Sequence, residues 1–278
     1  MFGKSMGVIQ VDGLVKSYGD VDAVDGLSFS VERGELYGFL GPNGAGKTTT
    51  IGVLTGQLRP DSGTARVLET DPTAEPIETR HRVGILPEQG SPPSFLTPRE
   101  FLDFVGDVRG LEPDRVATQT DVWADRLGFE SKLDTLHTDL SRGQQQKVMI
   151  TQAFVHEPDV VFIDEPLANL DPLVQEQVKQ FLVSYAAGDN AVFVSTHNID
   201  VAEEICTRVG IVADGQLVTE RSLDGSDGGD GGDGGDGNGR GDGIDSDESL
   251  LEIFLERVED ADVRDAPSLD RLGAESKQ

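Results

Sequence analysis

Cysteine is nearly absent from this chain of 278 residues, since Cys206 is the single example. One cysteine excludes an intrachain disulfide and a cysteine-ligated metal cluster. Long apolar runs are also missing. No stretch approaches the 18 residues of a membrane-spanning helix, and the N-terminus has no apolar segment of the signal-peptide kind. We therefore expect a cytoplasmic location. Because Cys206 lies in an apolar helical context with Val201 and Ile205, we expect it to be a buried structural thiol.

Positive charge is scarce as well. The chain has 23 Lys and Arg residues against 51 Asp and Glu, which gives a formal charge of −28. No basic stripe is available to neutralise phosphates, so nucleic-acid binding is not expected. Acid spread along the whole chain with few lysines resembles the surfaces of proteins from extreme halophiles, and we expect a halophilic archaeal source. The alternative, a local acidic interaction tail, fits only the Gly/Asp tract near the C-terminus.

That tract, residues 223–247, is dominated by Gly and Asp and cannot bury enough apolar surface to offset its ordering entropy. We expect a disordered linker there. Calcium-binding repeats are disfavoured because no aliphatic position recurs. Residues 248–260 contain apolar positions at helical spacing, which predicts a helix that docks on the preceding domain. Residues 261–278 are expected to form an acidic, solvated tail.

A glycine-rich loop is the clearest feature of the chain. Gly41, Gly46, Lys47 and Thr48 match G-x-x-x-x-G-K-[ST], after the apolar run 36–40 and before a helical pattern. In that context, backbone N–H groups and the helix N-terminus bind phosphate. The alternative is an ordinary glycine-rich turn, which the flanking pattern disfavours.

The motif also predicts individual roles. Lys47 is expected to reach the β- and γ-phosphates of a nucleoside triphosphate, and the Thr48 hydroxyl to hold Mg²⁺. The expected nucleotide contacts of this loop are Gly41, Pro42, Asn43, Gly44, Ala45, Gly46, Lys47, Thr48 and Thr49.

Two acids follow a buried-strand pattern further along the chain. The apolar run 159–164 ends in Asp164 and Glu165. Asp164 suits Mg²⁺ coordination, and Glu165 at the strand tip can polarise an attacking water. Acids at the end of one strand are common, but this pair follows a phosphate-binding loop by about 120 residues, which favours a nucleotide-hydrolysing site.

The residues Leu140-Ser141-Arg142-Gly143-Gln144 lie just before that strand. They resemble the L-S-G-G-Q signature motif of the ABC ATPase family. Four further positions are similar to family motifs: Tyr18 to the aromatic residue that stacks on adenine, Gln89 to the glutamine that senses Mg²⁺ and the γ-phosphate, Asp171 to the D-loop and His197 to the switch histidine. The similarity extends over residues 8–220.

This resemblance implies an α/β fold: a P-loop NTPase core with a mainly parallel sheet, an N-terminal antiparallel β subdomain and an α-helical signature subdomain. The ATPase domain would span 6–222, with the helical subdomain at about 90–145. Two chains would enclose two ATP molecules head to tail, so that Ser141, Gly143 and Gln144 contact the nucleotide of the opposite chain. Arg142 replaces the first glycine of the signature, and we expect activity with altered affinity.

Leu86–Gln89 and Leu96–Glu100 look like ABC exporter subunits for small molecules or drugs. The resemblance therefore implies an ATP-binding subunit that works with a membrane permease on the cytoplasmic face and dimerises with itself or a paired subunit. Residues 90–99 would carry the groove for the permease. A soluble ABC ATPase that assembles another complex, or a regulatory binding module with little turnover, remains an alternative.

Periodicity predicts the remaining elements. Strands are expected at 8–11, 21–24, 27–31, 64–68, 83–86, 191–195 and on both sides of the Asp214-Gly215 turn, and helices at 47–57, 98–109, 115–127, 131–136, 141–156 and 172–187. We expect Phe101, Phe104 and Trp123 to pack inside the helical segment.

Overall fold

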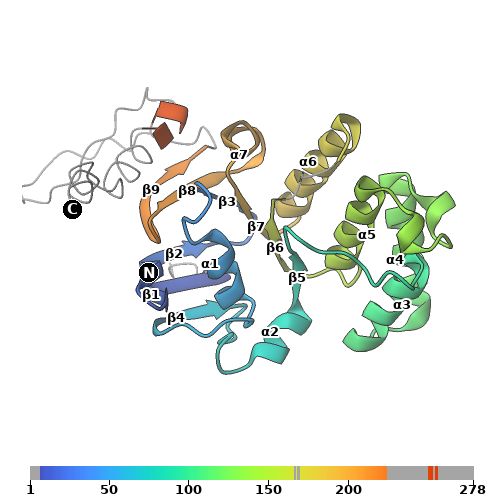
Figure 1. Ribbon diagram of the computed structural model, residues 1–278, viewed down its shortest axis with the longest axis horizontal. Helices are drawn as coiled ribbons and strands as arrows, with labels where there is room; N and C mark the ends of the chain where they lie inside the picture. The colour runs from blue at the N-terminus through green and yellow to red at the C-terminus, as the bar shows by residue number, and fades with distance from the viewer. Residues whose placement is uncertain (1–6, 166, 168–169, 224–249, 253, 256–278) are drawn as a thin grey trace, which may run out of the picture. The chain divides into compact units, whose positions relative to one another are not determined.

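The computed structural model describes residues 7–165, 167, 170–223, 250–252 and 254–255 (Figure 1). The chain divides into two units, residues 1–224 and 225–278. In the second unit, residues 250–252 and 254–255 are helical. The expected tract after Leu223, the acidic tail and most of the C-terminal helix lie outside the described residues.

A three-stranded antiparallel sheet occupies the N-terminal part of the first unit. It consists of β1 (Ile9–Tyr18), β2 (Val21–Val31) and β4 (Ser62–Val67), in the order β2-β1-β4. The prediction of two separate strands at 21–24 and 27–31 is wrong, because β2 is continuous. The register between β1 and β2 shifts between the pairs Leu14–Leu27 and Lys16–Val24, so the Asp25-Gly26 step lies within the strand.

The second sheet has six strands in the order β5-β6-β7-β3-β8-β9. Their bounds are β3 (Leu36–Leu40), β5 (Val83–Leu86), β6 (Val160–Asp164), β7 (Ala191–Thr196), β8 (Arg208–Ala213) and β9 (Gln216–Ser222). All neighbouring pairs are parallel except β8 and β9, which form the predicted hairpin. Every residue of β3, β6 and β7 is buried, as expected for central strands that are covered on both faces.

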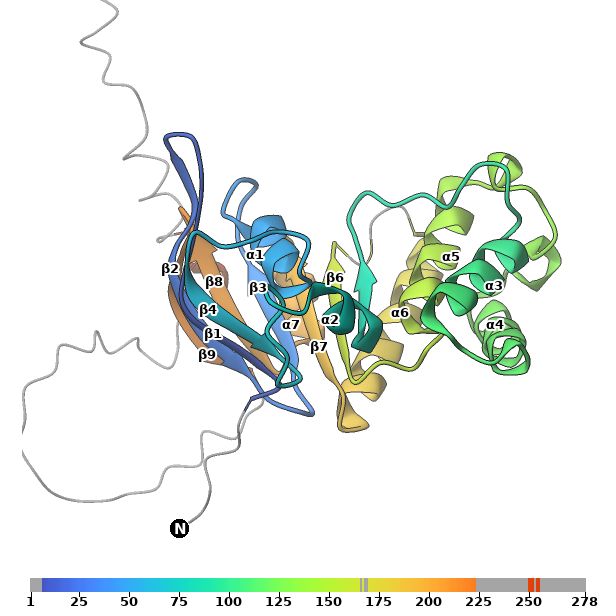
Figure 2. The same cartoon turned by 90° about the horizontal axis from the view of Figure 1, so that it is seen from below.

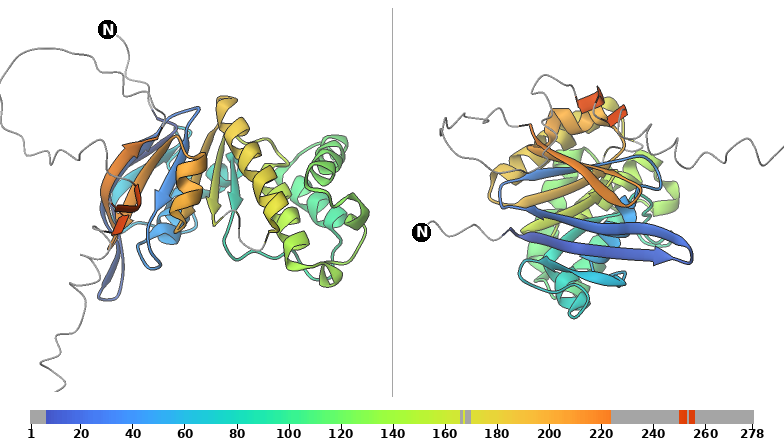
Figure 3. Two further views of the ribbon diagram at one scale, coloured as in Figure 1. Left: turned by 90° about the horizontal axis from the view of Figure 1, so that it is seen from above. Right: turned by 90° about the vertical axis from the view of Figure 1, so that its left-hand side faces the viewer.

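Helices cover the two faces of this sheet. Figure 2 shows α1 (Lys47–Leu54) between the two sheets, where it contacts β2, β4 and β6. Figure 3 shows α6 (Pro172–Ala187) and α7 (Ile199–Ile205) on the opposite face. Cys206, directly after α7, is buried as predicted, and burial raises the pKa of its thiol to about 12. Among the described residues, no helix combines the length and apolar character needed to cross a bilayer.

The helical segment follows β5 in the chain. It contains α3 (Pro98–Arg109), α4 (Pro113–Leu127) and α5 (Arg142–Phe154). Thr97 and Glu100 form a capping box at the start of α3, and Gly110 ends that helix in the left-handed conformation. The helix predicted at 131–136 is wrong, because two short 3-10 helices, Glu130–Lys132 and His137–Asp139, stand there instead.

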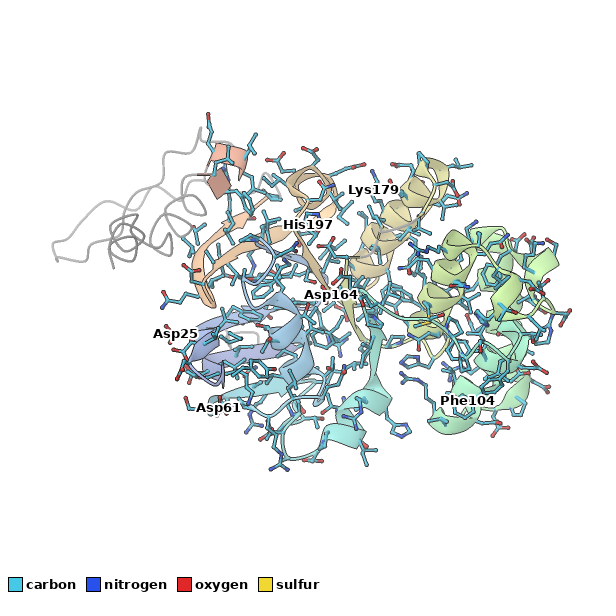
Figure 4. All side chains as sticks on the ribbon, in the orientation of Figure 1. Asp25, Asp61, Phe104, Asp164, Lys179 and His197 are labelled. Carbon is cyan, nitrogen blue, oxygen red and sulfur yellow. The ribbon has the colours of Figure 1, made fainter. Side chains whose placement is uncertain are left out.

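Aromatic packing joins the helical segment to α6. The ring of Trp123 stacks on Phe154 at 5.3 Å and meets Phe181 edge-on at 4.6 Å. Phe101 is buried as predicted, but the prediction for Phe104 is wrong, because its side chain is 55% exposed (Figure 4). The buried stripe of α3 follows positions 98, 101, 102 and 106, and Phe104 lies off that stripe.

Candidate nucleotide-binding site

The candidate site forms where four parallel strands end. Because β5, β6, β7 and β3 are neighbours and run in the same direction, their carboxyl ends lie at one edge of the sheet. Leu40 pairs with Thr196, and Asp164 pairs with Ser195. The residues that follow these strands are therefore brought together from separate parts of the chain, with Thr48 and Asp164, for example, 116 positions apart.

A pocket of about 440 Å³ opens at this edge, within the usual range for small-molecule sites. It is lined by Tyr18, Ala23, Asn43, Gly44, Gly46, Lys47, Thr48, Thr49, Glu88, Asp164, Glu165 and His197. Figure 4 labels Asp164 and His197, which lie near each other at this edge. Of the predicted loop residues, Gly41, Pro42 and Ala45 are not in the lining. They form the backbone that shapes the loop.

Two glycines make the loop possible. Gly46 has a φ of 95°, and a Cβ there would lie 2.2 Å from the carbonyl oxygen of Ala23. A Cβ on Gly41 would lie 2.4 Å from the carbonyl oxygen of Val212. Gly46 also begins α1 without any side-chain hydrogen bond to cap it. The first-turn N–H groups of α1 are therefore free to bind an anion at the mouth of the helix.

Lys47 is buried inside the loop, with 7% of its surface exposed. Its Nζ donates hydrogen bonds to the carbonyl oxygens of Gly41, at 2.7 Å, and Pro42, at 2.9 Å. Burial lowers the pKa of Lys47, and the nearby carboxylates of Glu165 and Asp164 act in the opposite direction. The ammonium group is thus fixed at the base of the pocket, facing the carboxylates.

Asp164 connects β6 to the phosphate-binding loop. Its Oδ2 accepts a hydrogen bond of 2.8 Å from the Thr48 hydroxyl, and its Oδ1 accepts one from the Ser195 hydroxyl. Asp164 itself is 4% exposed. A hydroxyl and a carboxylate held together are hard oxygen donors, the type that Mg²⁺ prefers. These residues fit a magnesium ion bound together with nucleotide phosphates.

Glu165 has a φ of 53°, a left-handed conformation that is uncommon outside glycine. Its Oε1 lies 3.1 Å from the backbone nitrogen of His197 and 2.6 Å from Nδ1 of the same residue. Its Oε2 accepts a hydrogen bond of 3.2 Å from the Thr196 hydroxyl. The carboxylate is therefore oriented by β7 and its following loop. A positive φ in such a place is consistent with a functional constraint.

Tyr18 stands at the edge of the pocket and is 50% exposed. The ammonium of Lys16 lies 5.5 Å from the centre of its ring, and Lys16 in turn pairs with Asp61 at 3.0 Å. Asp61 also accepts a 2.7 Å hydrogen bond from the backbone of Ser17. The end of β1 is held in place, and an aromatic face is left accessible for stacking.

Gln89 is not among the residues that line the pocket, whereas its neighbour Glu88 is. Both follow β5 in a loop where no periodicity fixes which side chain points inward. Sequence reasoning therefore missed Glu88. The pocket lining adds Glu88 to the predicted residues, and the role of Gln89 stays a prediction.

The signature residues do not line this pocket. Ser141 caps α5, where its hydroxyl accepts a 3.2 Å hydrogen bond from the Gln144 nitrogen, and the Gln144 side chain accepts one of 3.0 Å from the Ser141 nitrogen. Gly143 lies in the first turn of the same helix. Asp171 caps α6 by accepting from the Val174 nitrogen at 3.1 Å. Ala168 and Asn169, shortly before Asp171 in the chain, lie outside the described residues.

The phosphate loop, the acids at the end of β6 and the histidine after β7 define a nucleotide-binding domain of the P-loop class, and the predicted fold class is confirmed. The family model for ABC transporters matches residues 24–168, which is just over half of the chain. The chain belongs to the ABC transporter family.

Several relatives share this similarity. The daunorubicin/doxorubicin resistance ATP-binding protein DrrA of Streptomyces peucetius is 36% identical over 212 residues, covering 76% of this chain and 64% of that protein. Nod factor export ATP-binding protein I of Paraburkholderia xenovorans is 35% identical, covering 76% and 70%. A solved structure of the ATP-binding subunit of an ABC transporter superposes with a TM-score of 0.73 at 29% identity, covering 78% and 90%. The chain thus spans somewhat less than two thirds of the first relative.

Proposed function

We propose that this chain is the ATP-binding and ATP-hydrolysing subunit of an ABC transporter that acts in export. The observation that carries the proposal is the convergence of Lys47, Thr48, Asp164 and Glu165 on one pocket. Relatives named for drug resistance and for Nod factor export support the direction of transport.

In this proposal, the nucleotide lies along the mouth of α1. Tyr18 stacks on adenine, and the N–H groups of the loop bind the phosphates. Lys47 leaves the carbonyl oxygens of Gly41 and Pro42 and donates to the β- and γ-phosphates. Thr48 and Asp164 would hold Mg²⁺, which neutralises phosphate charge when bound. In this proposal Gln89 also contacts Mg²⁺, as the sequence predicts, and its neighbour Glu88 lines the pocket.

Glu165 is proposed to accept a proton from the attacking water. A general base must lie within hydrogen-bond reach of that water and have a fixed orientation. The contacts of Glu165 with His197 and Thr196 supply the orientation. His197, whose side chain is 61% exposed, can also contact the γ-phosphate from the rim of the pocket.

A second chain completes the site in this proposal. The N-terminus of α5, with Ser141, Gly143 and Gln144, is a helix end suited to phosphate, but it does not line the pocket of its own chain. Head-to-tail dimerisation, with itself or with a paired subunit, would place it on the nucleotide of the partner, with Asp171 beside the same interface. A membrane permease would hold the dimer at the cytoplasmic face.

Glu165→Gln tests the chemistry directly. We expect ATP hydrolysis to fall by about 100-fold or more, in line with the usual contribution of a general base, while nucleotide binding persists. Glu203→Gln, the same change at an exposed position on α7, serves as the matched control. Unchanged hydrolysis by the Glu165 variant would contradict the assignment of the base.

The proposed role in a transporter is tested by measuring whether the chain associates with membranes. We expect the chain to associate with membranes only when a permease is co-expressed. Membrane association without any permease would count against the transporter hypothesis. Copurification with a soluble complex would favour the alternative, an ATPase that assembles that complex.

We also infer a high-salt source from the charge of −28. A large net charge of one sign destabilises the compact state by self-repulsion, and salt screens that repulsion. The expected result is an unfolding temperature that rises as KCl is increased from millimolar to molar concentration. A temperature that stays constant would contradict the inference.

A further inference from the structure

A single carbonyl group ties the loop after β5 to the segment that leads into the signature helix. The Leu96 oxygen lies 3.1 Å from the backbone nitrogen of His137 and 3.1 Å from its Nδ1. A second backbone hydrogen bond, from the Arg99 nitrogen to the Leu133 oxygen at 3.1 Å, lies beside it. The segment between Leu133 and His137 is therefore bonded at one end to the first turn of α3 and at the other to the loop.

The imidazole of His137 is deeply buried, with 1% of the residue exposed. A carbonyl oxygen can only accept, so Nδ1 must carry the proton. Nε2 has no partner among the residues that the structure describes. Burial also lowers the pKa of His137. The ring is therefore neutral, in one tautomer, and packed edge-on against Phe101 with ring centres 6.1 Å apart.

The backbone carbonyl of His137 is bonded to residues at the start of the signature helix α5. Its carbonyl oxygen accepts hydrogen bonds from the Leu140 nitrogen, at 3.2 Å, and from Nε2 of Gln145, at 3.0 Å. Gln145, in the second turn of α5, also donates to the Leu140 oxygen at 3.3 Å. Leu140 immediately precedes Ser141, the N-cap of α5. A continuous chain of hydrogen bonds thus runs from Leu96 to the cap.

We propose that His137 is a positioning residue, which fixes the signature residues Ser141 and Gly143 relative to the loop 91–97 through its hydrogen bond to the Leu96 carbonyl. The inference deepens the proposed function and rests on it, because Ser141 matters to hydrolysis only if it contacts the nucleotide of a partner chain. Displacement of the loop would be transmitted to the signature without passing through the core sheet.

The test uses two amide variants of the full chain. In His137→Asn, the side-chain nitrogen can occupy the place of Nδ1 and keep the bond to Leu96. In His137→Gln, it reaches the place of Nε2 instead and leaves the carbonyl without its side-chain donor. The two substitutions introduce the same functional group and differ in where it lies.

The measurements are kcat and KM for MgATP, the affinity for a fluorescent ADP analogue, and the thermal unfolding temperature. We expect His137→Gln to lower kcat by about tenfold, since small displacements far from the chemistry can cost up to 100-fold. ADP affinity, set in the core, should stay within about twofold, and His137→Asn should restore most of kcat. Retained ADP binding also shows that the core of the variant is folded.

Two outcomes would overturn the inference. One is normal kcat in both variants. The other is an equal loss of kcat in both, which would mean that the ring fills space and its donor does not matter. Ser141→Ala separates this failure from that of the proposed function. If Ser141→Ala lowers kcat while both His137 variants are normal, the composite site stands and the role of His137 does not. If Ser141→Ala itself has no effect, the composite site is wrong.

Discussion

Two helices of this chain, α1 and α5, have N-termini suited to phosphate binding, and the two N-termini are stabilised in different ways. α1 starts at Gly46 without a side-chain cap and depends on the ends of neighbouring strands for its surroundings. α5 starts at Ser141 and is capped by its own residues through a capping box with Gln144. The first element is completed by distant parts of the same chain, whereas the second is locally complete and does not line that pocket. The contrast suggests that nucleotide binding and fast hydrolysis can be separated by mutation.

The largest expected effect is on the α1 side. Lys47→Ala removes the buried ammonium, and each charge-assisted hydrogen bond to phosphate contributes about 1.5–3 kcal/mol. We expect nucleotide affinity to fall by about 100-fold or more, as measured by calorimetric titration. Lys179→Ala is the control, because this lysine pairs with Glu176 and Glu204 outside the pocket. Equal affinities of the Lys47 variant and the unmodified chain would contradict the site.

Ser141→Ala should affect hydrolysis and spare nucleotide binding, the reverse of what is expected for Lys47→Ala. We expect kcat to fall by about tenfold, the loss of a strong hydrogen bond to a charged group, with ADP binding nearly unchanged. The variant also loses an N-cap, which costs about 1 kcal/mol in folding stability. Ser141→Gly controls for that cost, because glycine also lacks the hydroxyl but costs only about a few tenths of a kcal/mol at an N-cap. The kcat of this variant should fall as well, and normal hydrolysis there would show that capping alone explains the effect.

His156 lies where the helical segment meets the six-stranded sheet. His156 follows α5, and its Nε2 lies 3.1 Å from the Val83 oxygen of β5. Burial, with a further contribution from Arg109, lowers the pKa of His156 to about 3. Below the usual value of 6.5, the unfolded chain binds a proton that the folded chain does not. This residue should therefore cost stability as pH falls from about 6.5 towards 3.

The expected slope is at most about 1.4 kcal/mol per pH unit. Urea denaturation at several values between pH 6.5 and 4.5 measures it. Because many carboxylates titrate in the same range, the quantity of interest is the difference between the unmodified chain and His156→Gln. Parallel stability curves for the two proteins would show that His156 does not titrate as described.

The smallest effect is expected on the exposed face of α3. Phe104→Ser should change the free energy of unfolding by less than about 0.5 kcal/mol, as is usual for surface positions. Phe101→Ser, three residues earlier on the buried stripe, should cost several kcal/mol, about 3–5 for the comparable change to alanine. Similar unfolding temperatures for the two variants would contradict the assignment of faces on α3.

The elements that the sequence predicted best carry local signals at both ends. The ranges 98–109 and 172–187 agree with α3 and α6, because Thr97-Pro98 and Asp171-Pro172 mark their starts. The phosphate loop was equally visible, since its backbone requires glycine at fixed spacing. These features depend on residues near one another in the chain.

Features that depend on distant contacts were missed. α2 (Pro76–Arg82) buries only Thr79, so it has no apolar stripe to reveal it. Glu88 enters the pocket because of the path of the chain after β5, and nothing in the neighbouring residues marks that turn. The bond from His137 to Leu96 joins residues 41 positions apart, and both look like ordinary loop residues in the sequence.

The burial of Lys47 affects the heat of nucleotide binding. In the folded chain, this ammonium group has already exchanged most of its hydration shell for the carbonyl oxygens of Gly41 and Pro42. An incoming phosphate therefore replaces two protein acceptors, and most of the cost of dehydrating the cation is met when the domain folds. Affinity at this position then depends on how much better a charged phosphate oxygen accepts from the ammonium group than a neutral carbonyl oxygen does.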